Sequence, residues 1–185
     1  MDATDVASSF LWREGRILLL HRSSTMDSFP DRWTVVSGRR EAGEEIAATA
    51  CREIHEETGY AASALRPLAA AVPFEVGEGG RPWRVHSFLW LLHDPGEPRL
   101  NRENVEARWS SPAQAARRDT VPGLVETLHE LLPRPSAEIR DMVESLRDDR
   151  ERGAHALAAA GLERLADELP RLDSWPALLA GAGAL

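Results

Sequence analysis

The segment "REIHEETGY" (residues 52–60) places three carboxylates, those of Glu53, Glu56 and Glu57, within five positions of one another. If the segment is helical, Gly59 is typical of the residue just past a helix C-terminus. That end of a helix carries partial negative charge and prefers cations. Glutamates that share one helix face also repel one another. Such a cluster is usually a solvated surface face, and the alternative is a site that a bound cation completes.

The residues before this segment extend the pattern at a fixed spacing. Gly38 lies six positions before Glu44, and Glu44 lies eight positions before Arg52, so residues 38–60 read G-x5-E-x7-R-E-I-x-E-E-x-G-Y. This pattern resembles the Nudix box, G-x5-E-x7-R-E-U-x-E-E-x-G-U, in which U is a bulky apolar residue. The resemblance implies an α/β/α sandwich with a mixed sheet. It also implies hydrolysis of a nucleoside diphosphate linked to another moiety.

The resemblance further implies a divalent cation, Mg²⁺ with Mn²⁺ as an alternative, that polarises the pyrophosphate and activates water. Carboxylates clustered on one helix face suit Mg²⁺, which keeps several waters and takes substrate phosphates as further ligands. The implied metal ligands are the three glutamates of the segment together with a backbone carbonyl around Ser37 and Gly38. Of these, Glu53 and Glu57 are also expected to act in catalysis.

Arg52 is the third residue expected to act in catalysis, because its position four residues before Glu56 suits it to hold a carboxylate. The general base is left open. In the family it is either a glutamate of the box, here Glu53, or a carboxylate from a later loop. The later loop is "GEPRLNRENVEARW" (96–109), and its candidates are Glu97, Glu103 and Glu106.

Contacts to the substrate are expected outside the box. Arg22 ends the second predicted strand, where relatives of the family often place an arginine that contacts phosphate. Arg32 and Trp33 lie just before the box loop, and Trp33 is expected to stack on a base. The substrate is expected to be a small nucleotide derivative.

The segment "RPWRVHSFLWLL" (81–92) offers two more candidates. Alternate residues of a strand share one sheet face, so Arg84 and His86 become polar contacts for the substrate if their face lines the cleft. The alternative is core packing for Phe88 and Trp90, the aromatic residues on that face, and a structural role for His86.

Residue patterns predict an α/β layout with mixed strand directions over residues 1–133. Residues 6–23 read as two strands joined at Glu14-Gly15. Gly43 is the expected N-cap of the box helix, with Glu44 and Glu45 in its first turn. Other strands are predicted in 32–38, 65–76, 81–92 and 105–109, and other helices in 111–118 and 121–132.

The composition shifts after "LPRPS" (132–136), which reads as a linker. Residues 134–185 are therefore predicted to form a second unit, a hairpin of two amphipathic helices with its turn near Gly153. Their apolar stripes must be buried, either on the first domain or across a homodimer, and the dimer is favoured. The run 149–154 also resembles the opening helical segment of translation initiation factor 2B-like proteins, which include ribose-bisphosphate isomerases. Too few residues follow the linker for the catalytic part of that family, so isomerase activity is not expected.

Bulk composition narrows the class of protein. The net charge of −8 argues against general nucleic-acid binding, although all 22 basic residues are Arg, which suits phosphate contacts. A single cysteine, together with the lack of a signal-peptide pattern or a long apolar run, predicts a cytoplasmic protein without a membrane segment. The sequence thus predicts a Mg²⁺-dependent Nudix hydrolase. The alternatives are a non-catalytic nucleotide-binding module whose helical tail recruits a partner, and another reaction on the same fold, such as diphosphate isomerisation.

Overall fold

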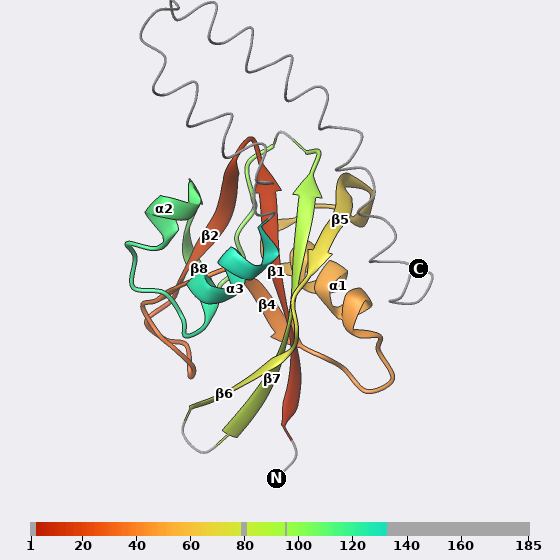
Figure 1. Ribbon diagram of the computed structural model, residues 1–185, viewed down its shortest axis with the longest axis vertical. Helices are drawn as coiled ribbons and strands as arrows, with labels where there is room; N and C mark the ends of the chain where they lie inside the picture. Colours follow the sequence, from red (N-terminus) through yellow and green to blue (C-terminus); the bar gives the residue numbers. More distant parts are fainter. Residues whose placement is uncertain (1–2, 79–80, 95, 133–185) are drawn as a thin grey trace, which may run out of the picture. The chain divides into compact units, whose positions relative to one another are not determined.

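The computed structural model describes residues 3–78, 81–94 and 96–132 (Figure 1). These residues belong to one compact unit that ends at Leu132. The predicted linker, the helical hairpin beyond it and the segment that resembles initiation factor 2B-like proteins lie outside the described residues. The domain boundary at residue 133 and the dimer therefore remain predictions.

The described residues contain strands and helices in the predicted order. The strands are β1 (Thr4–Arg13), β2 (Arg16–Arg22), β3 (Trp33–Thr34), β4 (Val36–Arg39), β5 (Leu65–Ala70), β6 (Phe74–Glu78), β7 (Arg81–Leu92) and β8 (Asn104–Ser110). The helices are α1 (Ile46–Thr58), α2 (Pro112–Ala115) and α3 (Leu124–Leu131), with a 3-10 turn, η1 (Ala62–Ala64). In the described part of the chain no helix has the length and apolar character of a membrane span.

The strands form a mixed sheet in the order β3-β2-β1-β7-β5. β1 runs parallel to β7 and antiparallel to β2 and β4, while β8 pairs with β2. The predicted strand 65–76 is divided at residues 71–73 into β5 and β6, which pair with different halves of β7. Pro73, which has no N–H to donate to a ladder, lies in the break. The α/β fold with a mixed sheet is confirmed.

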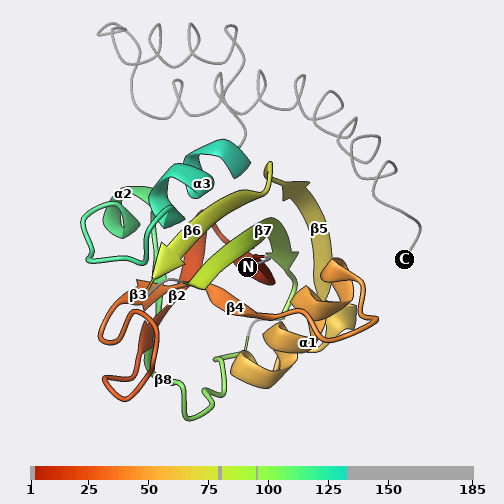
Figure 2. The same cartoon turned by 90° about the horizontal axis from the view of Figure 1, so that it is seen from below.

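Helices cover both sides of the sheet, with α1 on one side and α2 and α3 on the other (Figure 2). On the α1 side, Ala50 and Ile54 pack against buried strand residues that include Leu11, Leu18 and Trp90. On the other side, α3 contributes Leu124, Leu128 and Leu131 to a second cluster around Phe10, Ile17 and Leu19. The alternating inward and outward side chains of the strands supply both clusters.

The ends of α1 differ from the expectation at one end only. Gly59 adopts φ 75° as the C-cap and its N–H donates to the carbonyl of His55, which confirms the predicted terminus. The helix begins at Ile46 with Glu45 as N-cap, so the assignment of the N-cap to Gly43 is wrong. Gly43 has φ 80° and lies in the preceding turn. Residues 41–44 form a turn in which the Glu44 N–H donates to the carbonyl of Glu41, and Glu45 then has an extended backbone with ψ 140°, so the helix begins only at Ile46.

Candidate active site

A cavity of about 580 Å³ opens beside the C-terminal half of α1. Its charged lining comes from α1, from the ends of β2 and β4 and from loops, and it includes Arg22, Arg39, Arg40, Arg52, Glu53, Glu56 and Glu103. Its apolar wall, defined here as Phe10, Phe74, Val76, Trp83, Val85 and Leu124, comes from one face of the sheet and from α3. The cavity therefore has both charged groups and a surface for an apolar or aromatic moiety, as ligand pockets commonly do.

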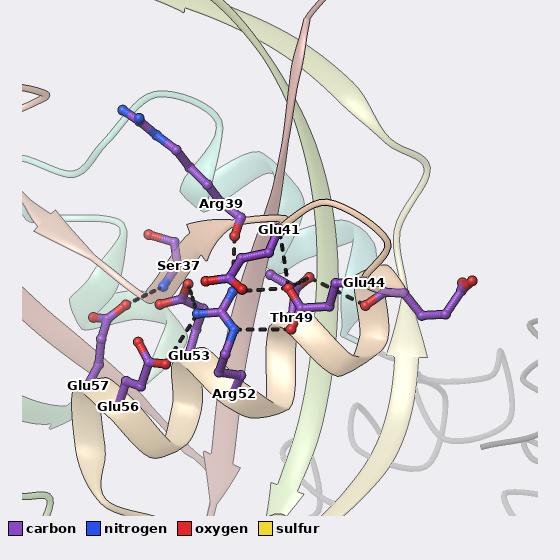
Figure 3. Close-up of polar contacts among 10 residues, drawn as sticks. Ser37, Arg39, Glu41, Glu44, Thr49, Arg52, Glu53, Glu56 and Glu57 are labelled. Carbon is purple, nitrogen blue, oxygen red and sulfur yellow. Dashed lines mark hydrogen bonds and ion pairs between the residues drawn. The ribbon is translucent and has the colours of Figure 1, made fainter.

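Arg52 binds three glutamates at once (Figure 3). Its Nε and Nη2 donate to the two carboxylate oxygens of Glu44 at 3.0 and 3.1 Å, a two-point contact. Its Nη1 donates to Glu53 Oε1 at 2.7 Å and to Glu56 Oε1 at 3.3 Å. Its Nη2 also reaches the carbonyl of Arg39, at 3.0 Å, so that this one side chain joins α1 to the end of β4.

Glu44 is held in place by the loop as well as by Arg52. Its Oε2 accepts hydrogen bonds from the Thr49 hydroxyl at 2.8 Å and from the Glu41 N–H at 3.2 Å. The hydrogen bonds from Arg52 and then Thr49 lower the pKa of Glu44 from 4.5 to about 2. Glu44 precedes α1, away from the three glutamates in the C-terminal half of the helix, and its hydrogen bonds indicate a structural role.

We expect Glu44→Gln to change how stability depends on acid. The folded-state pKa lies below the unfolded one, so the contribution of Glu44 to stability is present above pH 4.5 and is lost as pH falls toward about 2. The variant should be less stable than wild type at neutral pH and should lose less stability on acidification. Urea unfolding midpoints at several pH values measure this, and Glu45→Gln, an exposed neighbour, is the control. If the urea midpoints of wild type and Glu44→Gln fall by the same amount as the pH is lowered, the lowered pKa of Glu44 would be contradicted.

The carboxylate of Glu53 lies directly against the backbone of Gly38. A Cβ atom built on Gly38 would fall 1.8 Å from Glu53 Cδ and 2.0 Å from its Oε1. Burial raises the pKa of Glu53, and hydrogen bonding from Arg52 opposes that effect. The glycine of the pattern is thus required at this position because a side chain there would displace the carboxylate.

Glu57 is the buried carboxylate of the segment, with 3% of its surface exposed. Its Oε1 accepts from the Ser37 N–H at 2.9 Å, and its Oε2 accepts from the Asn104 side-chain amide at 2.8 Å. Burial raises the pKa of Glu57 to about 8, against the effect of these two hydrogen bonds. The three glutamates therefore differ in environment, because Glu56 has a side chain that is 52% exposed.

Comparison with known proteins agrees with this geometry. A model of the NUDIX domain matches residues 3–131. The chain belongs to the Nudix hydrolase family. A Nudix hydrolase from M. smegmatis, RenU, has 26% identity and a TM-score of 0.57, over 71% of this chain and 89% of that one. A C. elegans Ap4A hydrolase in a binary complex has 21% identity and a TM-score of 0.60, over 69% of this chain and 94% of that one, which shows a shared fold.

A protein from Myxococcus xanthus described as an octanoyltransferase is 35% identical over 117 residues, which is 62% of this chain. The match covers 32% of that protein, so the chain spans about a third of its length. The similarity is therefore to a segment about the size of the Nudix domain within a longer protein.

Of the three loop glutamates considered as a base, only Glu103 lines the cavity among the described residues. Its negative charge contributes to the raised pKa of both Glu53 and Glu57, which places it near both box carboxylates. Glu106 lies on β8 opposite His21 and pairs with Arg108. Glu97 lies near Tyr60 and is exposed. Asn104, next to Glu103, was not predicted, since no motif spacing points to an amide that donates to Glu57.

Three residues before the Nudix box, Arg22, Arg32 and Trp33, were predicted to contact the substrate, and only Arg22 lines the cavity. Arg22 lines the cavity, and its Nε donates to the carbonyl of Ser28 at 3.0 Å. Trp33 is 9% exposed, stacks on His21 at 4.9 Å and carries the Arg118 guanidinium 4.1 Å from its centroid, outside the cavity lining. Arg32 points to Thr120 and Asp119. The structure thus corrects the expected base stacking by Trp33, because protein groups already cover that ring, and it places Arg32 outside the cavity lining.

The expected contacts of Arg84 and His86 are also corrected. Along β7 the cavity is lined by Trp83, Val85 and Ser87, and alternate residues of a strand point to opposite faces. His86 instead contacts Asp5 Oδ1 through Nε2 at 2.8 Å, and Arg84 pairs with Glu75. The structural role left open for His86, and core packing for Phe88 and Trp90, fit this face.

The carboxylates of the Nudix box have the donor chemistry that a hard divalent cation prefers. Arg52 binds only one oxygen of Glu53 and one of Glu56, which leaves the second oxygen of each without a hydrogen bond in the described residues. Across those residues, no group of three or more His, Cys, Asp or Glu side chains is gathered closely enough to hold a metal ion. The residue types fit a cation, and binding one requires the side chains to draw together.

Proposed function

We propose that this chain is a Mg²⁺-dependent hydrolase that cleaves the diphosphate of a nucleotide derivative. The observation that carries the proposal is that Glu53, Glu56 and Glu103 line one cavity together with Arg22 and the apolar wall. Acidic groups that bind a cation, an arginine for phosphate and an apolar surface for a base are the parts such a reaction needs. Membership of the Nudix hydrolase family supports it.

The proposed reaction assigns the residues of the cavity to cation binding, to the orientation of carboxylates and to substrate binding. Glu53, Glu56 and Glu57, with a carbonyl near Ser37 and Gly38, would hold the cation, which supplies Lewis-acid stabilisation of charge on the phosphoryl oxygens. Arg52 orients two of these carboxylates by its hydrogen bonds. Ser37 and Asn104 orient Glu57. Arg22 binds phosphate, and the apolar wall excludes water from the bound nucleoside.

Glu103 is proposed as the general base, and this gives a prediction. Glu103→Gln should lower kcat by about 100-fold or more, the usual contribution of a positioned proton acceptor. Glu97→Gln and Glu106→Gln should retain wild-type activity, because neither side chain lines the cavity. Steady-state kinetics of the three variants on one substrate measure this. If Glu103→Gln is fully active, the base is a box glutamate instead.

A substrate panel tests the proposed function. The protein is incubated with Mg²⁺ and NDP-sugars, ADP-ribose, dinucleoside polyphosphates or (d)NTPs, and the released products are separated and quantified. We expect turnover of at least one compound, abolished by EDTA and by Glu53→Gln. Tight binding of one compound without turnover of any would favour a non-catalytic nucleotide-binding module.

A further inference from the structure

Arg39 is an arginine of the cavity to which the proposed function has so far given no role. Its carbonyl accepts a hydrogen bond from Arg52 at 3.0 Å, so its backbone is joined to the residue that orients the box glutamates. Its side chain extends away from those glutamates (Figure 3) and its guanidinium lies 4.7 Å from the centroid of the Trp83 ring. Arg39 therefore connects the acidic part of the cavity with the apolar wall.

The guanidinium of Arg39 has no hydrogen bond or ion pair to any other described residue, and this distinguishes it within the cavity. Arg22 donates to the carbonyl of Ser28, Arg40 pairs with Asp5 at 3.0 Å, and Arg52 binds the glutamates. Its one polar or aromatic interaction among the described residues is with the ring of Trp83. A guanidinium has five N–H donors, and all of those of Arg39 are available to a ligand.

The sheet register keeps Arg39 on the cavity side. Arg39 pairs with Val6 on β1, and Val6 pairs with Val85 on β7, two residues from Trp83. All four residues line the cavity. The guanidinium carbon of Arg39 lies over the Trp83 ring, 4.7 Å from its centroid, and such a contact uses none of the N–H donors as a hydrogen bond to a protein acceptor.

We propose that Arg39, held against Trp83, binds a phosphate group of the substrate next to its nucleoside. The planar fork of an arginine matches two phosphate oxygens, and the stacking contact fixes that fork before the ligand arrives. This inference rests on the proposed function, because it assigns one phosphate contact of the same cavity. It differs from that function in that it concerns binding, which is measured without turnover.

Binding of α,β-methylene-ADP, which cannot be cleaved between its phosphates, and of adenosine tests the proposal by calorimetry with Mg²⁺ present. We expect Arg39→Gln to weaken binding of the phosphate compound by about 10-fold or more, as loss of a charged hydrogen bond does, and to leave adenosine binding unchanged. Arg39→Lys should bind α,β-methylene-ADP with an affinity between those of wild type and Arg39→Gln. Arg66→Gln, at an exposed arginine of β5 outside the cavity lining, is the matched control and should bind as wild type does.

A double-mutant cycle with Trp83→Leu tests the stacking contact. Trp83→Leu should weaken binding of α,β-methylene-ADP less than Arg39→Gln does, and the double variant should be close to Arg39→Gln alone. The proposal is overturned if wild type binds the phosphate compound no better than adenosine, if Arg39→Gln binds it normally, or if that variant loses adenosine equally. If Arg39→Gln weakens binding of α,β-methylene-ADP but the wild-type protein turns over no compound of the substrate panel, the phosphate contact of Arg39 is supported and the proposed hydrolase function is refuted.

Discussion

Glu57→Gln is expected to leave the metal-free protein as stable as wild type or more stable, and to lower turnover by about 100-fold or more. Burial raises the pKa of Glu57 from 4.5 to about 8. The contribution of this raised pKa to stability is complete below pH 4.5 and is lost as pH rises through about 8, because the buried carboxylate must then ionise. A glutamine needs no proton, so the variant should not lose stability over this pH range.

The surroundings of Glu57 can accept the amide. The Ser37 N–H can donate to the glutamine oxygen as it does to Glu57 Oε1. Asn104 Oδ1 is buried and has no hydrogen-bond partner in the described residues, so turning the Asn104 amide by half a turn brings an acceptor to the new NH₂ group. After the turn the Asn104 NH₂ group takes the buried position in which Oδ1 had no partner, so the substitution removes a carboxylate oxygen from the proposed metal site without raising the number of unpaired buried groups.

Thermal unfolding in EDTA at several pH values and kinetics with Mg²⁺ together measure the two effects of Glu57→Gln. Glu45→Gln, at the exposed N-cap of α1 and outside the motif, is the control and should change activity little. Should Glu57→Gln unfold the metal-free protein, the carboxylate would be serving structure and the account of this helix end would be wrong.

Gly38→Ala is the second substitution with a large expected effect. The new Cβ would overlap the Glu53 carboxyl group, at 1.8 Å from Cδ, so either the carboxylate or β4 must move. Displacing a catalytic group by about 1 Å commonly costs about 100-fold in rate, and we expect at least that loss in kcat. The overlapping atoms are the far end of a flexible side chain that can turn away, so we expect the loss of stability to be small.

Gly15→Ala separates these two effects in an activity assay combined with urea unfolding. Gly15 has φ 76° in the β1–β2 turn with no atom within 4 Å of a built Cβ, so alanine there costs about 1 kcal/mol of backbone strain. We expect Gly15→Ala to lose stability and keep kcat, and Gly38→Ala to lose kcat with a smaller loss of stability. Wild-type kcat in folded Gly38→Ala would show that the position of Glu53 does not matter.

The resemblance to the Nudix box predicted the fold, and the end of α1 was predictable from local helix geometry. The αL terminus at Gly59 and the Arg52–Glu56 contact follow from helix geometry alone. Ser111 as the N-cap of α2, with Pro112 at its first position, likewise follows from the pair Ser-Pro at a helix start, whereas the reciprocal contact with Gln114 was not predicted. Such features depend on residues close together in sequence.

Features that depend on distant contacts were not predictable in the same way. Alternation shows that Trp83 and Arg84 face opposite sides of β7, but which side carries the cavity depends on where α3 packs. Trp33 was expected to stack on a base, but His21 and Arg118, which are distant in sequence or on another strand, cover its ring. The contact between Asn104 and Glu57 joins residues 47 positions apart, and no local pattern marks it.

Titration of Mn²⁺ into the metal-free protein, followed by electron paramagnetic resonance of the free ion, tests the central claim most directly. The claim is that the carboxylates at the end of α1 form a divalent-cation site. We predict saturable binding to wild type and to Glu45→Gln, and binding weakened by about 10-fold or more in Glu53→Gln and Glu57→Gln. Equal Mn²⁺ affinity in all four proteins, or no binding to any, would contradict it.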